Sequence, residues 1–167
     1  MQTCIAYYSK TGNTKMAVEY LAEKLGATLI ALNDGTNYKG LIGFMKGGMN
    51  ASIGRTAKLD RTIFDEIAKF DRIILATPVW AGKTTPAINA VLTHVDFQGK
   101  QVYVVTTQAD PQCRDAQKRK EFYRKAVEEK NGTFAGLFAL YGASPGAVAP
   151  REEINQRVDA AIHLDEF

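Results

Sequence analysis

The chain has 167 residues, of which 46% are hydrophobic and 23% charged, an ordinary composition for a globular protein with a substantial core. The formal net charge of +3 is too small to indicate nucleic-acid binding by itself. No apolar run approaches the roughly 20 residues of a membrane span, and the N-terminus lacks the basic and apolar regions of a secretory signal. We therefore expect a cytoplasmic protein that acts neither on nucleic acid nor at a membrane.

Apolar runs alternate with stretches of helical spacing along the chain. Residues 2–8 are apolar at nearly every position, which is typical of a strand buried on both faces of a parallel sheet. Residues 14–25 then show the spacing of an amphipathic helix, and Gly26 is a typical helix stop. Further strands are expected over residues 27–32, 72–77, 100–107 and 133–141, and further helices over residues 62–69 and 114–130 and from Pro86 and Pro150 onward.

Two of these helices carry more detailed predictions. Thr85 stands directly before Pro86, a combination typical of an N-cap followed by the first helical position. The helix over residues 114–130 is highly charged, so its few apolar side chains must form its buried face. The side chains expected to face the core are Phe122, Tyr123, Ala126 and Val127.

Residues 33–58 are unusually rich in glycine. Within them Ile42, Met45, Met49 and Ile53 keep helical spacing, so we expect a short helix flanked by loops. The sequence leaves two roles open for this segment. It either packs over the sheet, or forms a lid or partner surface beside a ligand site.

The repeated alternation of strand and helix predicts an α/β fold with a five-stranded parallel sheet. Right-handed crossovers place helices on both faces of such a sheet. We expect one domain over residues 1–167, with residues 33–58 as an insertion after the second strand. Ligands of such sheets bind beyond the carboxyl ends of the strands, which makes the loops after the first, third and fourth strands the candidate site.

The loop after the first strand, Ser9–Thr14, combines hydroxyl side chains with a glycine and opens into a helix. A helix N-terminus offers unpaired N–H groups and the positive end of the helix dipole, which together favour a phosphate. Gly12 allows a positive φ or a close approach of the backbone. The alternative is a plain strand-to-helix turn in which Thr14 or Asn13 is the N-cap.

The loop after the third strand, Thr77–Gly82, contains Trp80, the only tryptophan of the chain. A large aromatic side chain at a ligand-facing sheet edge suits stacking on a planar ring, although it can also pack into the domain surface. Residues 82–85 imitate the end of a nucleotide-binding P-loop, but that motif needs a glycine where Thr77 stands. We therefore exclude nucleoside triphosphate binding by this route.

The two loops together resemble the flavodoxin family, and the resemblance extends over essentially the whole chain. Ser9–Thr14 is similar to its phosphate-loop signature, T/S-x-T-G-x-T, and Thr77–Gly82 is similar to its second flavin loop. The resemblance implies a flavodoxin-like three-layer α/β sandwich with strand order 2-1-3-4-5. It also implies flavin mononucleotide (FMN) as cofactor, bound at the switch point between the first and third strands.

By the same resemblance, three loops would hold FMN. The phosphate would be held by the side chains of Ser9, Thr11, Asn13 and Thr14 and by the backbone of Lys10 and Gly12. Trp80 would lie against one face of the isoalloxazine ring, with Thr77, Pro78, Val79, Ala81 and Gly82 around its edge. The third loop would consist of Thr107, Gln108, Ala109 and Asp110.

The chain departs from the family pattern in two respects. Electron-transfer flavodoxins often place an aromatic ring in the third loop, and none stands there in this sequence. The second flavin face is then open or covered from the insertion, where the candidates are Tyr38, Phe44, Met45 and Met49. Carrier flavodoxins are also usually acidic, whereas the isoelectric point of this chain is about 8.8, which weakens the case for a basic partner.

The resemblance implies a redox protein that passes electrons between partners through bound FMN. The alternative is an FMN-dependent oxidoreductase of the NAD(P)H:quinone type, so the partner is either a redox protein or a small substrate such as a quinone or NAD(P)H. The open third loop and the insertion favour the enzyme, whereas the short chain favours the carrier. A flavin-free phosphoacceptor module is disfavoured, because Thr77 stands where its aspartate would be needed.

The cysteines and histidines of this sequence show no spacing typical of a disulfide, a metal site or a catalytic pair. Cys4 and Cys113 are far apart and indicate neither a disulfide framework nor a metal site. Cys4 lies in an apolar run and is expected to be buried. His94 and His163 are expected at the surface, so the sequence predicts no catalytic side chain.

Overall fold

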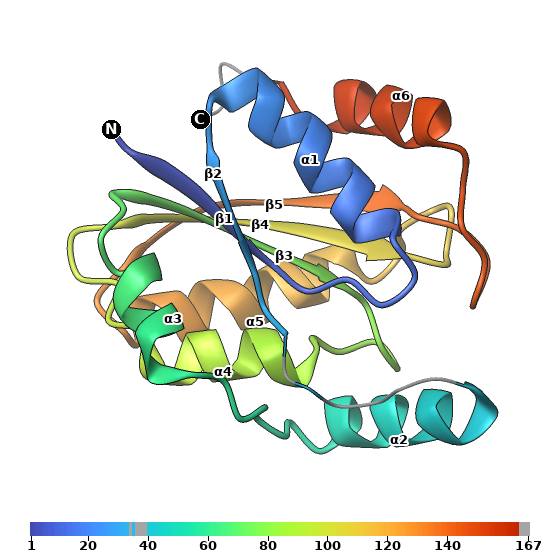
Figure 1. Cartoon of the computed structure of the whole chain (residues 1–167), viewed down its shortest axis with the longest axis horizontal. Helices are drawn as coiled ribbons and strands as arrows, with labels where there is room; N and C mark the ends of the chain where they lie inside the picture. The colour runs from blue at the N-terminus through green and yellow to red at the C-terminus, as the bar shows by residue number, and fades with distance from the viewer. Residues whose placement is uncertain (34, 36–39, 164–167) are drawn as a thin grey trace.

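The computed structural model describes residues 1–33, 35 and 40–163, and the side chains of all of these except 40–42 and 44 (Figure 1). The strands are β1 (Thr3–Tyr7), β2 (Thr28–Ala31), β3 (Arg72–Pro78), β4 (Gln101–Gln108) and β5 (Thr133–Tyr141). The helices are α1 (Asn13–Leu25), α2 (Gly40–Ser52), α3 (Arg61–Ile67), α4 (Pro86–His94), α5 (Ala116–Glu128) and α6 (Arg151–Ala161). None of the described helices combines the length and apolar character needed to cross a membrane.

The five strands form one parallel sheet in the order β2-β1-β3-β4-β5, which confirms the order implied by the resemblance. Strand β1 pairs with β2 on one side and with β3 on the other. The connection from β1 to β2 and the connection from β2 to β3 therefore run in opposite directions across the sheet. Helices α1 and α6 cover one face of the sheet, and α3, α4 and α5 cover the other (Figure 1). The carboxyl ends of β1 and β3 therefore meet at a switch point, where such folds bind ligands.

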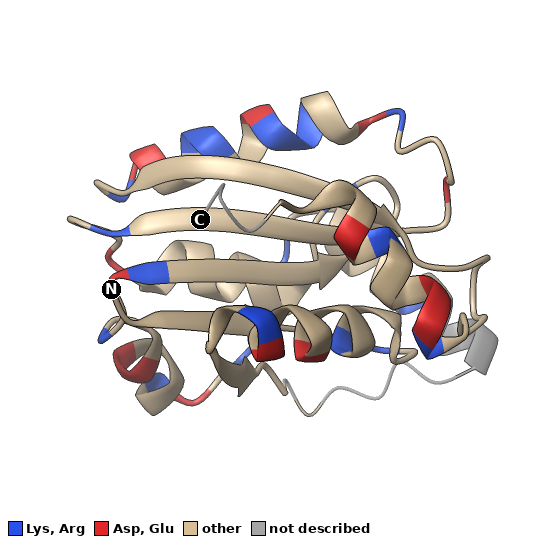
Figure 2. Ribbon diagram, turned by 90° about the horizontal axis from the view of Figure 1, so that it is seen from above, with Lys and Arg blue, Asp and Glu red and all other residues tan. Residues whose placement is uncertain are grey.

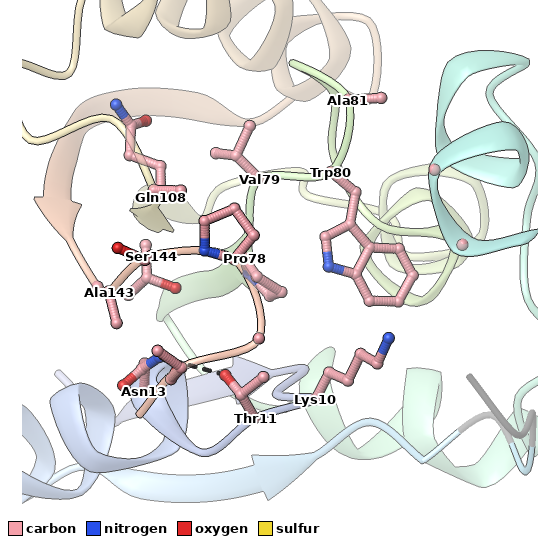
Figure 3. A pocket seen from close by; sticks show the side chains of 18 residues that line it. Lys10, Thr11, Asn13, Pro78, Val79, Trp80, Ala81, Gln108, Ala143 and Ser144 are labelled. Atoms are coloured by element: carbon pink, nitrogen blue, oxygen red, sulfur yellow. Dashed lines mark hydrogen bonds between the residues drawn. The ribbon is translucent and has the colours of Figure 1, made fainter. Parts of the chain in front are cut away.

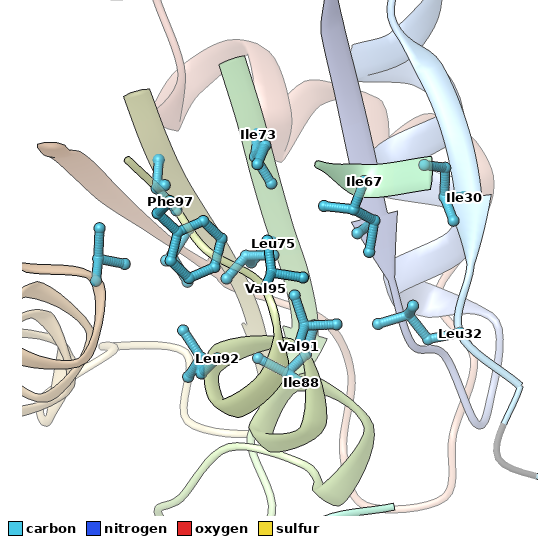
Figure 4. Close-up of a cluster of buried hydrophobic side chains, with 14 of the residues drawn as sticks. Ile30, Leu32, Ile67, Ile73, Leu75, Ile88, Val91, Leu92, Val95 and Phe97 are labelled. Carbon is cyan, nitrogen blue, oxygen red and sulfur yellow. The ribbon is translucent and has the colours of Figure 1, made fainter. Parts of the chain in front are cut away.

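Successive strand residues supply two separate cores, since their side chains alternate between the faces of the sheet. Cys4 and Ile73 pack in the core beneath α3, α4 and α5, and Figure 4 shows that core beside β3. Ile5 and Ile74 pack in the other core, against α1 and α6. All four side chains are fully buried. Charged residues gather on the helices and loops instead (Figure 2), as expected for a sheet covered on both faces.

Two helix boundaries confirm sequence predictions. Gly26 ends α1 with φ of 62°, in the left-handed region that favours glycine. Thr85 stands at the N-cap of α4, followed by Pro86. Its side chain makes no cap hydrogen bond, because its hydroxyl lies 2.9 Å from the buried Thr77 hydroxyl. Thr85 therefore joins α4 to the end of β3 as well as beginning the helix.

The buried face of α5 differs from the prediction at two positions. Phe122 was expected to face the core, and that is wrong, since it is 48% exposed. The buried residues are Arg119, Tyr123 and Val127, which recur every four residues along the helix. The sequence pattern excluded a charged residue from the core, so it assigned the buried stripe to apolar positions alone. Arg119 is nevertheless only 6% exposed.

Candidate functional site

A cavity of about 440 Å³ lies at the carboxyl edge of the sheet, bordered by α2 and by the loops after β1, β3, β4 and β5 (Figure 3). Its volume is typical of a site for a small molecule or cofactor. Of the residues predicted from the sequence, those that line it are Lys10, Thr11, Asn13, Pro78, Val79, Trp80, Ala81, Thr107, Gln108 and Ala109. The remaining predicted residues, Ser9, Gly12, Thr14, Thr77, Gly82 and Asp110, are not part of its lining.

The backbone at the start of α1, where Asn13 lines the cavity, carries unpaired donors. Gly12 stands at the N-cap with φ of 109°, in a conformation that L-residues rarely adopt. Within the described part of the chain, the N–H groups of Gly12, Asn13 and Thr14 donate no hydrogen bond. No acidic residue stands in the first turn of the helix. Unpaired donors at the positive end of a helix dipole suit an anionic group such as phosphate.

The hydroxyl groups of the same loop are largely engaged within the protein. Thr14 is 2% exposed, and its hydroxyl lies 2.7 Å from the Thr107 hydroxyl. Ser9 Oγ accepts a hydrogen bond from the Lys15 N–H at 3.2 Å. Thr11 is exposed and lines the cavity, and its hydroxyl accepts a hydrogen bond from Asn13 Nδ2 at 3.2 Å. The unpaired donors at the start of α1 are therefore backbone N–H groups rather than the hydroxyl groups of the loop.

Trp80 is held by a tight turn on the side of the cavity that α2 borders. Trp80 and Lys83 exchange two backbone hydrogen bonds, at 3.0 and 2.8 Å, around Ala81 and Gly82. Both central residues have positive φ, 47° and 73°, as a two-residue turn of this type requires. The Trp80 and Tyr8 rings also meet at right angles, with their centroids 5.5 Å apart. Backbone and side-chain contacts together fix the indole beside the cavity.

Helix α2 packs closely against the same indole. A Cβ atom on Gly47 would lie 2.9 Å from Cζ3 of Trp80, closer than real Cβ contacts allow. The absence of a side chain at Gly47 thus lets the helix backbone approach the ring. The helix expected within residues 33–58 is present, and it borders the cavity; a role as a lid stays a prediction.

Four side chains of the insertion were candidates to cover the second flavin face. Met45 and Met49 lie on α2 and are 66% and 59% exposed. Neither of them lines the cavity. Tyr38 and the side chain of Phe44 lie outside the described residues.

The loop after β5 is a part of the site that sequence reasoning missed. Residues 142–147 line the cavity and lie across it from Trp80 (Figure 3). Asn13 ties this loop to the start of α1: its Nδ2 donates to the Ala147 carbonyl at 2.8 Å, and its Oδ1 accepts from the Ala149 N–H at 2.9 Å. The sequence feature that could have identified this loop is the stretch of Gly, Ser and Pro directly after the fifth strand, at the same sheet edge as the other loops.

In the third loop, residues 107–110, the amide side chain of Gln108 lines the cavity, whereas the carboxylate of Asp110 does not. Gln108 is 8% exposed and lines the cavity. Asp110 instead accepts hydrogen bonds from the side chain and the backbone N–H of Arg114. These bonds lower the pKa of Asp110 to about 2. Asp110 therefore caps a turn before α5 and stays ionised.

The cavity carries positive but no negative side-chain charge. Its described lining contains no aspartate or glutamate and one cation, Lys10. Lys10 Nζ lies 5.8 Å from the centroid of the Trp80 ring, and partial burial lowers its pKa. His94 and His163 are exposed, as predicted, and neither lines the cavity.

Comparison with known proteins assigns this architecture to a family. The family model described as flavodoxin matches residues 2–136, most of the chain. The chain belongs to the flavodoxin family. The search of curated proteins found no match.

Several solved structures of flavodoxin-like proteins have the same fold as this chain. A flavoprotein in complex with FMN from Lactobacillus acidophilus is 19% identical, with a TM-score of 0.63, over 83% of this chain and 91% of that one. Oxidised flavodoxin 1 from Bacillus cereus is 13% identical, with a TM-score of 0.58, over 96% and 94%. The Trp repressor binding protein from Bacillus subtilis is 16% identical, with a TM-score of 0.68, over 96% of each chain.

Proposed function

We propose that this flavodoxin-family protein binds FMN in the cavity and passes electrons between redox partners through it. The observation that supports this most is the pairing of two features at one sheet edge. Unpaired N–H groups of Gly12, Asn13 and Thr14 stand on one side, and the fixed indole of Trp80 stands on another. The first suits a phosphate and the second suits a planar ring, and FMN contains both.

Each wall of the cavity then has a distinct task. The backbone of the 12–14 segment, with Thr11, would bind the phosphate, and Trp80 would lie against the ring. Residues 142–147 would close the cavity from the other side. When bound, the flavin supplies the electron-transfer chemistry, and the protein supplies binding, orientation and electrostatic environment.

The direct test is the visible absorption spectrum of the purified protein, before and after addition of FMN and desalting. We expect a retained flavin band, and FMN as the compound released on denaturation. A colourless protein that cannot retain FMN would contradict the proposal.

A second function, FMN-dependent reduction of a quinone by NAD(P)H, is favoured by the third loop. Gln108 lines the cavity there, and no aromatic side chain stands in residues 107–110. A flavin face without an aromatic cover suits a stacked small substrate. Turnover of NADH or NADPH with a quinone separates the two functions, since a carrier shows almost none without a separate reductase.

A further inference from the structure

A buried positive charge stands directly behind one wall of the cavity. Arg119 of α5 is 6% exposed, and its guanidinium donates a hydrogen bond to Oε1 of Gln108. Its Nε has no hydrogen-bond partner, and within the described residues no carboxylate forms an ion pair with it. Burial of a charge without a counter-charge is strongly unfavourable.

The groups beside Arg119 do not supply that counter-charge. The hydroxyl groups of Thr84 and Tyr123 are buried beside each other and carry no charge. Burial raises the pKa of the Tyr123 hydroxyl, and burial likewise raises the pKa of the neighbouring Cys113 thiol. Both groups therefore stay neutral. The ionised Asp110 carboxylate of the same loop is engaged by Arg114, so a neutral amide, and no carboxylate of the described residues, contacts the Arg119 guanidinium directly.

The position of this charge relates it to a ligand in the cavity. Gln108 lines the cavity, so the Arg119 guanidinium lies one hydrogen bond behind the wall. Figure 3 shows the side chain of Gln108 on the same side of the cavity as Val79, whereas the side chains of Thr11 and Lys10 lie on another side. No acidic side chain of the described lining offsets the charge.

We propose that Arg119, acting through Gln108, is a positioning residue that favours the reduced, anionic form of the bound flavin. This inference rests on the proposed FMN binding. When two electrons and one proton add to the neutral isoalloxazine, the ring gains one negative charge. A cation fixed in a poorly solvated wall attracts that charge more strongly than an exposed cation does. Arg119 thus strengthens the binding of reduced FMN relative to oxidised FMN.

The test is the midpoint potential of the FMN-loaded protein, titrated with dithionite, which supplies the electrons and is oxidised to sulfite. For Arg119→Met we expect at least a tenfold loss in the affinity ratio of reduced to oxidised FMN, equivalent to a two-electron potential lower by about 30 mV. Arg119→Lys keeps the charge and should retain most of the wild-type potential. Lys120→Met removes an exposed charge from the same helix and should leave the potential unchanged. A wild-type potential in Arg119→Met would overturn the inference.

Gln108→Glu provides a second measurement that needs no flavin. It gives Arg119 a carboxylate partner at the same hydrogen-bond position with almost no change in volume, and it removes only the long 3.4 Å hydrogen bond from Gln108 Nε2 to the Asp110 carbonyl. The flavin-free variant should therefore melt at a higher temperature than wild type, and a lower melting temperature would overturn the claim that Arg119 lacks a counter-charge. The proposed function fails if wild type retains no FMN, whereas this inference alone fails if wild type retains FMN and Arg119→Met leaves its potential unchanged.

Discussion

The contact between α2 and Trp80 can be tested by comparing alanine substitutions at two neighbouring glycines, of which only one faces the indole. In Gly47→Ala, the added Cβ would meet Cζ3 of the indole at 2.9 Å, Cε3 at 3.1 Å and Cη2 at 3.4 Å. In Gly48→Ala, the nearest atom outside the helix is Cβ of Ala81 at 4.0 Å, an ordinary contact. Both changes put the same methyl group into the same helix, so Gly48→Ala is a matched control.

The expected magnitudes follow from two opposing effects. Replacement of glycine by alanine within a helix stabilises it by about 0.5–1 kcal/mol. Overpacking against a fixed ring costs about 1–3 kcal/mol. Gly48→Ala should therefore be more stable than wild type, and Gly47→Ala should be less stable than Gly48→Ala by the overpacking term. Because Tyr8 and the turn at residues 81–82 hold the indole, the clash can be relieved only by displacing α2 or by breaking those contacts of Trp80, and either change alters the wall of the cavity.

Thermal melting and FMN titration measure both consequences. For a chain of this size, each 1 kcal/mol changes the melting temperature by about 2–4 °C. We expect Gly47→Ala to melt below Gly48→Ala and to bind FMN more weakly than Gly48→Ala does. Both glycines line the cavity, but only a methyl group at Gly47 meets the indole. Equal melting temperatures and equal FMN affinities for the two variants would refute the packing of α2 on Trp80.

Three further predictions address the other walls and the core. Trp80→Ala should weaken FMN binding more than Trp80→Phe does, since aromatic pairs contribute about 0.5–1.5 kcal/mol beyond their buried area; equal affinities by titration would remove the stacking role. Asn13→Ala leaves the N–H of Ala149 without its partner and should lower the free energy of unfolding by about 1–3 kcal/mol, measured in urea; an unchanged value would show that the tie is dispensable. Burial raises the pKa of Cys4 from 9.0 to about 12, so the unfolded thiol ionises first and Cys4 lowers stability as the pH rises from 9 towards 12. A thiol reagent at pH 8 should accordingly label Cys113 but not Cys4 in the native protein, and rapid labelling of both would contradict that burial.

Local sequence patterns predicted the parts of this fold that depend on local chemistry. The continuous apolar run of β1 indicated a strand covered on both faces, and the structure places Cys4 and Ile5 in opposite cores. Gly26 was identified as a helix stop from its type and position, and its φ of 62° explains why glycine is favoured there. The strand order came from the family resemblance, because periodicity does not determine which parallel strands are neighbours.

The parts that the sequence did not predict depend on contacts between distant segments. Asn13 was predicted to hold phosphate, but its side chain meets residues more than 130 positions away, a partnership that no local pattern encodes. Arg119 was not among the side chains predicted to face the core, because sequence patterning assigns charges to the surface. Arg119 is nevertheless buried, and its hydrogen-bond acceptor Gln108 lies at the end of β4, on a separate segment of the chain. Gly47 likewise gains its role only because α2 folds back onto Trp80.

The central claim is that FMN lies between the N-terminus of α1 and Trp80. A titration of the flavin-free protein with FMN and, separately, with riboflavin tests it most directly, with the fluorescence of Trp80 as the signal. We predict strong quenching by FMN and an affinity for FMN at least tenfold above that for riboflavin. One charge-assisted hydrogen bond to the phosphate, worth about 1.5 kcal/mol, already gives that ratio. Equal affinities would contradict a phosphate site at Gly12–Thr14, and an unquenched tryptophan would contradict a ring beside Trp80.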